Sequence, residues 1–81
     1  MKEAIYIEGE WCSKCYLMKP HVQKRAETNE YEFQVFRFDD ASVKEFDVKS
    51  VPMLVLRTDD MQDILNDEWI VNLISNQNNN G

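Results

Sequence analysis

Apolar residues in the first part of the chain recur first at the spacing of a strand and then at that of a helix. Residues Glu3–Glu8 read EAIYIE and carry apolar side chains on both faces, which is typical of a central strand. From Ser13 to Asn29 the apolar positions recur at helical spacing. Pro20 inside this stretch lacks a backbone donor and predicts a kink. The residues expected in the apolar stripe of the helix are Leu17, Met18, Val22 and Ala26.

A second strand and a short helix follow. Residues 31–39 read YEFQVFRFD, in which aromatic and β-branched residues alternate as in a strand. Residues Ala41 to Asp47 predict a short helix with Asp40 as its N-terminal cap. The first strand, the long helix and the second strand therefore form a βαβ unit, whose crossover should be right-handed.

The remaining apolar runs predict a hairpin and a final helix. Val51–Arg57 and Met61–Leu65 are two strands joined by a tight turn at Thr58–Asp60. Asn66 or Asp67 should cap the helix that follows. Its apolar stripe is predicted to consist of Trp69, Ile70, Leu73 and Ile74.

The predicted elements follow the order β-α-β-α-β-β-α, which defines an α/β fold. The first two strands are parallel and the last two antiparallel, so the sheet is a mixed four-stranded one with helices on both faces. A chain of 81 residues forms one small domain, which we assign to residues 1–75. Residues 76–81 read NQNNNG and are predicted to be a disordered Asn-rich tail.

Charge and apolar run length exclude two classes of partner. The net charge is −6, and from Thr58 onward the chain has acids but no Lys or Arg. Such a surface repels phosphate backbones, so we expect no binding to nucleic acid. No apolar run approaches the about 20 residues that cross a bilayer, so we expect no membrane association. The first residues, MKEAIYIEGE, carry acids where an export signal needs an apolar run, and this favours a cytoplasmic location.

The two cysteines, Cys12 and Cys15, lie three positions apart at the start of the predicted long helix. A structural disulfide is disfavoured in the reducing cytosol, so the pair is either a redox site or part of a metal site. A helix N-terminus favours a negatively charged sulfur, which makes Cys12 the expected nucleophile. Cys15, one turn further on, can resolve a mixed disulfide formed by Cys12. We expect Cys12 to be the more exposed thiol and the first to be alkylated.

Lys14 adds a positive charge within one turn of Cys12. It should favour the thiolate, so we expect a pKa for Cys12 below the roughly 8.5 of a free thiol and a reduction potential above roughly −270 mV. Solvent exposure and salt would weaken this effect, and a plain surface role for Lys14 stays open.

A metal site within one chain is disfavoured. Cys12, Cys15 and His21 are the only soft ligands, whereas a structural zinc site needs four. His21 is expected to be an exposed or half-buried residue of the helix. Two inert buried thiols are the other alternative, but the position of the pair between a strand and a helix argues against it. We expect neither metal nor cofactor.

Two segments resemble the thioredoxin family. Residues 10–15 read EWCSKC, with Pro20 five positions after the second cysteine, and are similar to the thioredoxin active-site helix. Residues 46–52 read FDVKSVP and precede an apolar strand; they are similar to the family segment that ends in a cis-proline facing the active-site disulfide. The resemblance covers residues 2–75 and implies a thioredoxin-like fold.

The resemblance also implies how substrate would bind. Val51–Pro52 should be a cis peptide bond that turns the Val51 backbone towards the sulfurs, where an extended substrate segment can pair with it. Trp11, Val51, Pro52 and Met53 are the implied substrate-binding residues, with Trp11 as a half-exposed lid beside Cys12.

The function implied by the resemblance is a monomeric thiol–disulfide oxidoreductase. It would reduce disulfide-containing proteins in electron transport and cell redox homeostasis, and a thioredoxin-reductase-like enzyme would recycle it. Two alternatives stay open at this point. One is a glutaredoxin-like enzyme that uses glutathione, although no Gly-Gly-x-Asp region is present. The other is a thioredoxin-fold binding subunit without redox role, which would dock through the acidic C-terminal half and an exposed Met53.

The sequence departs from the family at several positions. Ser13 and Lys14 separate the cysteines, where thioredoxins carry Gly-Pro and glutaredoxins Pro-Tyr. Tyr6 stands where thioredoxins keep a buried aspartate as proton acceptor, and a tyrosine cannot take that role at neutral pH. Arg37 stands where the family often has a lysine beside that acid, and Asn66 replaces a glycine of the substrate-facing loop.

Overall fold

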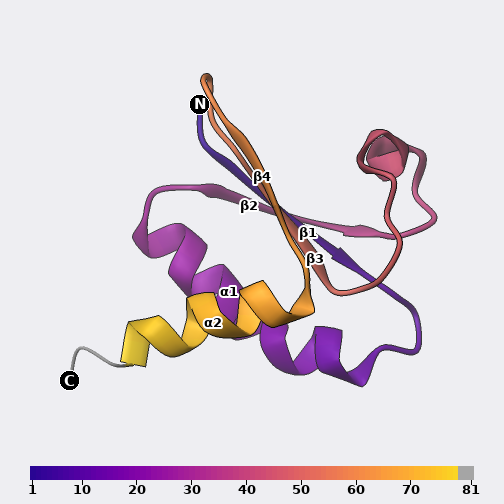
Figure 1. Cartoon of the computed structure of the whole chain (residues 1–81), viewed down its shortest axis with the longest axis horizontal. Helices are drawn as coiled ribbons and strands as arrows, with labels where there is room; N and C mark the ends of the chain where they lie inside the picture. The colour runs from indigo at the N-terminus through magenta and orange to yellow at the C-terminus, as the bar shows by residue number, and fades with distance from the viewer. Residues whose placement is uncertain (79–81) are drawn as a thin grey trace.

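The computed structural model describes residues 1–78 and contains the elements in the predicted order (Figure 1). The strands are β1 (Glu3–Glu8), β2 (Glu32–Arg37), β3 (Met53–Arg57) and β4 (Gln62–Leu65), and the helices are α1 (Ser13–Thr28), the 3₁₀ helix η1 (Ala41–Phe46) and α2 (Asp67–Asn78).

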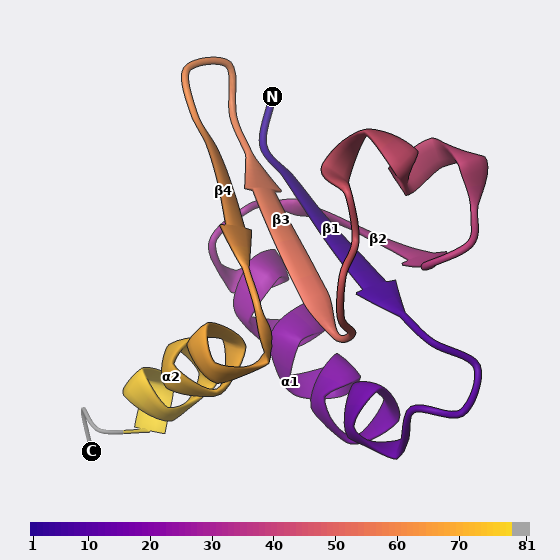
Figure 2. The same ribbon diagram turned by 45° about the vertical axis from the view of Figure 1, so that its right-hand side comes forward.

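The four strands form one mixed sheet in the order β2-β1-β3-β4. β1 pairs in parallel with β2 and antiparallel with β3, and β3 pairs antiparallel with β4. β1 is therefore central, as its apolar residues on both faces predict, and Figure 2 shows it between β2 and β3.

The two faces of the sheet are covered by different helices. Alternate residues of β1 point to opposite faces, so Tyr6 belongs to one core and Ile7 to the other. Helices α1 and α2 lie together on one face and η1 on the other (Figures 1 and 2). The buried core under α1 and α2 consists of Ala4, Tyr6, Met18, Val22, Ala26, Leu54 and Ile70; that under η1 consists of Ile5, Ile7, Val43, Phe46, Met53 and Val55.

Two residues predicted in apolar stripes lie outside them. Leu17 is 72% exposed, because the buried stripe of α1 begins at Cys15 and continues through Met18. A residue two positions after Cys15 points away from the sheet in a helix of 3.6 residues per turn. Trp69 is 60% exposed for the same reason, since Ile70 takes the position that faces the core.

The ends of several elements also differ from the prediction. Asp40 caps η1 as predicted, with its Oδ1 accepting a 2.8 Å hydrogen bond from the Ser42 amide, but the helix is 3₁₀ rather than α. Strand β3 starts at Met53, because Pro52 has no N–H for the ladder. Helix α2 continues to Asn78, three residues into the predicted tail. The rest of that tail, residues 79–81, lies outside the described residues.

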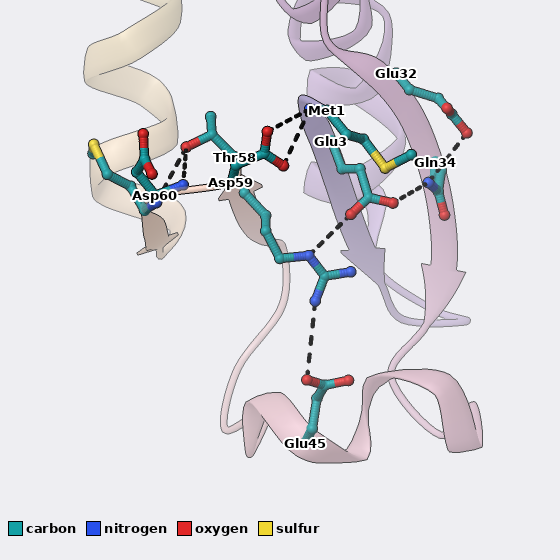
Figure 3. Close-up of polar contacts among 10 residues, drawn as sticks. Met1, Glu3, Glu32, Gln34, Glu45, Thr58, Asp59 and Asp60 are labelled. Atoms are coloured by element: carbon teal, nitrogen blue, oxygen red, sulfur yellow. Dashed lines mark hydrogen bonds and ion pairs between the residues drawn. The ribbon is translucent and has the colours of Figure 1, made fainter.

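The end of the sheet that carries Glu3 is held by a polar network (Figure 3). The Glu3 carboxylate accepts hydrogen bonds from Arg57 Nε at 2.9 Å and from Gln34 Nε2 at 3.2 Å, one to each oxygen. Arg57 Nη1 also lies 4.0 Å from a carboxylate oxygen of Glu45 in η1. These four side chains, here called the Glu3 network, connect β1, β2, β3 and η1.

Candidate active site

The cysteines lie at the opposite end of β1, where the chain turns into α1. Cys12 is the N-terminal cap of the helix, and its Sγ accepts a 3.1 Å hydrogen bond from the Cys15 amide. Cys12 and Cys15 form a disulfide, with their Cα atoms 5.2 Å apart. Because the free amides of the first turn point at Cys12 Sγ, a thiolate formed there on reduction is stabilised.

The two sulfurs differ in accessibility. Cys12 is half-buried, whereas Cys15 is fully buried as the first core residue of α1. An external disulfide can therefore reach Cys12 but not Cys15. This is the order of exposure that the sequence predicts.

The segment before β3 approaches Cys12 closely. The Val51–Pro52 peptide bond is cis, as the resemblance implies. A Cβ added at Gly9 would lie 3.1 Å from Val51 Cγ2 and 3.7 Å from Cys12 Cβ. A side chain at position 9 would therefore press on the Val51 side chain, which would have to move by a few tenths of an ångström.

A groove of about 560 Å³ opens beside Cys12. Trp11 and Phe38 contribute exposed aromatic surface to it. Arg37 adds a polar side chain to its lining and Val51 an apolar one. Arg37 Nη2 lies 3.1 Å from Glu10 Oε1, and this hydrogen bond raises the pKa of Arg37. The groove can therefore hold an extended chain next to the sulfur, with apolar and polar side chains both accommodated.

Two of the implied substrate-binding residues are placed differently from the prediction. Trp11 is 92% exposed and does not form a half-exposed lid over Cys12. Met53 is buried, and the prediction that it is exposed is wrong. As the first residue of β3 it pairs with Ile7, and its side chain alternates towards the core under η1.

Tyr6 connects β1 with the buried cysteine. Its side chain is fully buried, and its Oη donates a 2.7 Å hydrogen bond to the carbonyl oxygen of Cys15. Burial raises the pKa of Tyr6 far above its usual range, with further contributions from the charges of Glu8 and Asp67. Tyr6 is thus a neutral donor that fixes the first turn of α1, in keeping with its predicted unsuitability as a base.

Lys14 has an acidic partner that the sequence did not indicate. Its Nζ lies 2.6 Å from Asp67 Oδ2, with the two side chains 60% and 36% exposed. Asp67 is the first residue of α2, and Asn66 caps that helix by accepting a hydrogen bond from the Trp69 amide at 3.3 Å. The turn between the cysteines is therefore bonded to the start of α2, and much of the Lys14 charge is compensated.

Glu8 and Lys19 form an ion pair that sequence reasoning missed. Glu8 Oε1 lies 2.9 Å from Lys19 Nζ, and the Glu8 side chain is only 13% exposed. Arg37, which stands where the family often has a lysine, contacts Glu10 and Asp39 at the surface. The alternation Ala4, Tyr6, Glu8 along β1 was the available signal, because it places Glu8 on the face covered by α1.

The described residues offer neither a metal site nor a membrane span. Within residues 1–78, no three His, Cys, Asp or Glu side chains gather as metal ligands would, and His21 is exposed on α1. Among the same residues, no helix has both the length and the apolar character needed to cross a bilayer.

Comparison with known proteins identifies the fold. No family model matches the sequence, and a search of curated proteins gives no match either. Solved structures do match. Mitochondrial thioredoxin 3 from Saccharomyces cerevisiae, in its oxidized form, aligns with 93% of this chain and 74% of its own, at 24% identity and a TM-score of 0.74. The chain has the thioredoxin fold.

Two further structures agree with this assignment. Thioredoxin 1 from Thermosipho africanus aligns over 93% of this chain and 92% of its own, at 17% identity and a TM-score of 0.73. Thioredoxin from Fasciola hepatica aligns over 93% and 79%, at 21% identity and a TM-score of 0.70. The thioredoxin-like fold implied by the sequence resemblance is thus confirmed, and this fold holds a redox-type Cys-x-x-Cys pair at disulfide distance.

Proposed function

We propose that the protein is a thiol–disulfide oxidoreductase that reduces disulfides in other proteins. The observation that carries the proposal is the Cys12–Cys15 disulfide at the N-terminus of α1, of which only Cys12 is accessible. A dithiol with one exposed and one buried sulfur is suited to two-step exchange, because the first thiol attacks from outside and the second acts within the chain.

The reaction begins with the reduced protein. The Cys12 thiolate attacks one sulfur of a substrate disulfide and forms a mixed disulfide, while the other substrate sulfur leaves as a thiolate. Cys15 then attacks Cys12 Sγ, the Cys12–substrate bond breaks, and the second substrate sulfur leaves. The substrate gains two electrons and the protein becomes the Cys12–Cys15 disulfide, which a thioredoxin-reductase-like enzyme would reduce again.

The groove beside Cys12 would hold the substrate as an extended chain. The Val51 backbone borders Cys12, where it can pair with a substrate segment as an added strand. Exposed Trp11 and Phe38 offer aromatic surface to apolar substrate side chains. We place this activity in the cytoplasm and assign it to the monomer.

The test is reduction of insulin by the protein, with dithiothreitol as the electron source. Cys12→Ser should abolish the activity. Cys15→Ser should instead accumulate a covalent mixed disulfide that mass spectrometry assigns to Cys12. Brief alkylation of the reduced protein at limiting reagent should modify Cys12 first.

The alternatives predict other outcomes. If a double Cys-to-Ser variant retains the biological function, the protein is a binding subunit and our proposal fails. That alternative rested on the acidic C-terminal half and on an exposed Met53, and Met53 is buried. If glutathione with glutathione reductase restores the dithiol and thioredoxin reductase does not, the recycling system is of the glutaredoxin type.

A further inference from the structure

The acidic C-terminal half of the chain has no part in the exchange steps above, although it reaches the reactive turn. From Thr58 onward the chain carries acids and no Lys or Arg. A second surface pocket of about 500 Å³, here called the α2 pocket, opens at the start of α2. Its lining includes Lys14, which lies between the two cysteines, together with Ser50, Asn66, Asp67, Glu68 and Val71. The acidic half therefore borders the turn that carries Cys12.

The α2 pocket and the groove beside Cys12 lie on opposite sides of the segment that leads into β3. At the end of the sheet that carries the cysteines, β2 ends at Arg37 on one side of β1, and β4 ends at Leu65 on the far side of β3 (Figure 2). Arg37 and Phe38 line the groove, whereas the α2 pocket is lined by residues that follow β4. Ser50 lines both. A substrate chain that crosses Val51 therefore has one pocket on either side.

The two pockets differ in charge. The groove is lined by equal numbers of cationic and acidic side chains, namely Arg37, Lys49, Glu10 and Asp39. Its charges therefore balance.

In the α2 pocket, Lys14 Nζ lies 2.6 Å from Asp67 Oδ2, so these two charges compensate each other. Glu68 is exposed and, within residues 1–78, takes part in no ion pair. The α2 pocket is thus net negative, and the Glu68 carboxylate is available to a cation on a bound chain.

An extended substrate presents alternate side chains to the protein. Successive side chains of a strand point to opposite sides, so the residues two positions before and after the reacting cysteine face the protein together with it. Each lies roughly 7 Å from the cysteine along the strand, one towards the groove and the other towards the α2 pocket. The exposed rings of Trp11 and Phe38 offer an apolar contact to the first. Glu68 offers a charged contact to the second.

We propose that Glu68 selects substrates with a Lys or Arg two positions from the reacting cysteine, on the side opposite an apolar residue, an inference that rests on the proposed function. The basic side chain pairs with Glu68, and the apolar one packs against Trp11 and Phe38. The other acids of the C-terminal half act in the same sense at longer range, because they attract a cationic segment before contact. An acid at the same substrate position is repelled.

The exchange step itself is unchanged. The Cys12 thiolate attacks the substrate sulfur and forms the new S–S bond, and the other sulfur leaves with the electron pair of the bond that breaks. Glu68 takes no part in this transfer. It is a specificity-determining residue, and its contribution appears in the rate at which different substrates are attacked.

The test uses short peptides whose single cysteine is joined in a mixed disulfide to nitrothiobenzoate. A phenylalanine stands two positions from the cysteine on one side, and a lysine or a glutamate stands two positions away on the other. Both orders are made, because they correspond to the two directions in which a strand can cross Val51. Nitrothiobenzoate is the better leaving group, so Cys12 attacks the peptide sulfur, and stopped-flow absorbance of the released ion gives the second-order rate constant.

In one of the two orders, the lysine peptide should react about three- to fivefold faster than the glutamate peptide at low salt, within the range of an exposed ion pair. Added salt should shrink this ratio. A control peptide carries its lysine three positions from the cysteine. It has the same charge but directs the lysine away from the protein, so it should react more slowly. This comparison needs no protein variant.

Glu68→Gln keeps the size of the side chain and removes its charge, and it should at least halve the ratio between the lysine and glutamate peptides. The matched control is Glu32→Gln. It removes the same charge at an exposed position of β2, at the end of the sheet away from the cysteines, and should leave the ratio nearly unchanged.

Several outcomes would overturn the inference. One is equal rates for the lysine and glutamate peptides in both orders. Another is a ratio that Glu68→Gln lowers no more than Glu32→Gln does, because the net charge of the protein would then be responsible. A third is a control peptide that reacts as fast as the peptide with lysine two positions from the cysteine. All three leave the proposed function intact, since Cys12 still attacks the peptides. A protein that releases no nitrothiobenzoate from any peptide would refute the proposed function and the inference together.

Discussion

Glu3 and Glu8 lie at the two ends of β1, and each is paired with a cation from a neighbouring element. Glu3 accepts hydrogen bonds at both oxygens, from Arg57 and Gln34, within a network that also reaches Glu45. Glu8 has one cation, Lys19, and a buried oxygen without a well-directed hydrogen bond. The Glu3 network is distributed over four elements and far from the cysteines, whereas the Glu8 pair spans only β1 and α1, beside them.

This difference separates a carboxylate with several partners from one with a single partner. When a carboxylate has several partners, the loss of one leaves the others in place, so the cost in stability is modest. A carboxylate with one partner depends on that partner entirely. The predictions below test each end of the strand, from the largest expected effect to the smallest.

Lys19→Met should destabilise the protein most. It leaves the Glu8 carboxylate buried without its cation, and breaking a fully buried pair costs about 3–5 kcal/mol. Because the Lys19 side chain is 29% exposed, we expect the free energy of unfolding to fall by about 2 kcal/mol, measured by urea denaturation of the oxidised protein. Lys24→Met, at an exposed position of α1, is the control. Equal losses in the two variants would show that Glu8 does not depend on Lys19.

Tyr6→Phe should lower the free energy of unfolding by about 1–2 kcal/mol, because the buried Cys15 carbonyl loses its donor. The pKa of Tyr6 is raised in the folded protein, so folding retains a proton that the unfolded chain releases above about pH 10. Stability should therefore fall as the pH rises beyond that point, and Tyr6→Phe should lack this part of the decline. Tyr31→Phe, at a partly exposed tyrosine, serves as the control in the same titration.

Arg57→Met should cost about 1 kcal/mol in unfolding free energy, since the arginine is only partly buried and Glu3 keeps its bond to Gln34. The rate of insulin reduction should stay unchanged. A slower reduction in Arg57→Met would mean that the two ends of β1 are coupled, and the comparison would lose its basis.

Asp67→Asn should have the smallest effect. It removes the partner of Lys14, so the lysine charge acts more strongly on the Cys12 thiolate and raises the reduction potential. Both side chains are partly exposed, so we expect an effect of about 0.5 kcal/mol, which corresponds to about 10 mV for this two-electron couple.

Lys14→Glu should lower the reduction potential and raise the pKa of Cys12. Equilibration with glutathione measures the reduction potential of each variant. Added salt should shrink the differences in potential from the unmodified protein. Identical potentials at low salt would exclude a tuning role for Lys14.

Much of the site could be predicted because its residues belong to short local motifs. Cys12, Cys15 and the Val51–Pro52 segment are each recognisable from their immediate neighbours in sequence. The strand order follows from the βαβ unit and the hairpin, since local connections restrict how strands can pair.

The remaining features depend on contacts between distant elements. Lys14 and Asp67 are separated by 53 positions, and nothing near either residue indicates the other. The burial of Met53 and the exposure of Leu17 and Trp69 depend on where a helix or strand begins, because a shift of one residue moves a side chain to another face. Glu8 was missed because a charged residue at the end of a strand is usually exposed.

The pairing of β1 with β3 has a consequence for biosynthesis. Cys12 lies in the turn after β1 and Cys15 in the first turn of α1, whereas Val51 and Pro52 come later in the chain. The two thiols are therefore synthesised before the segment that borders them. Until β3 pairs with β1, the nascent chain carries Cys12 without the Val51–Pro52 segment beside it.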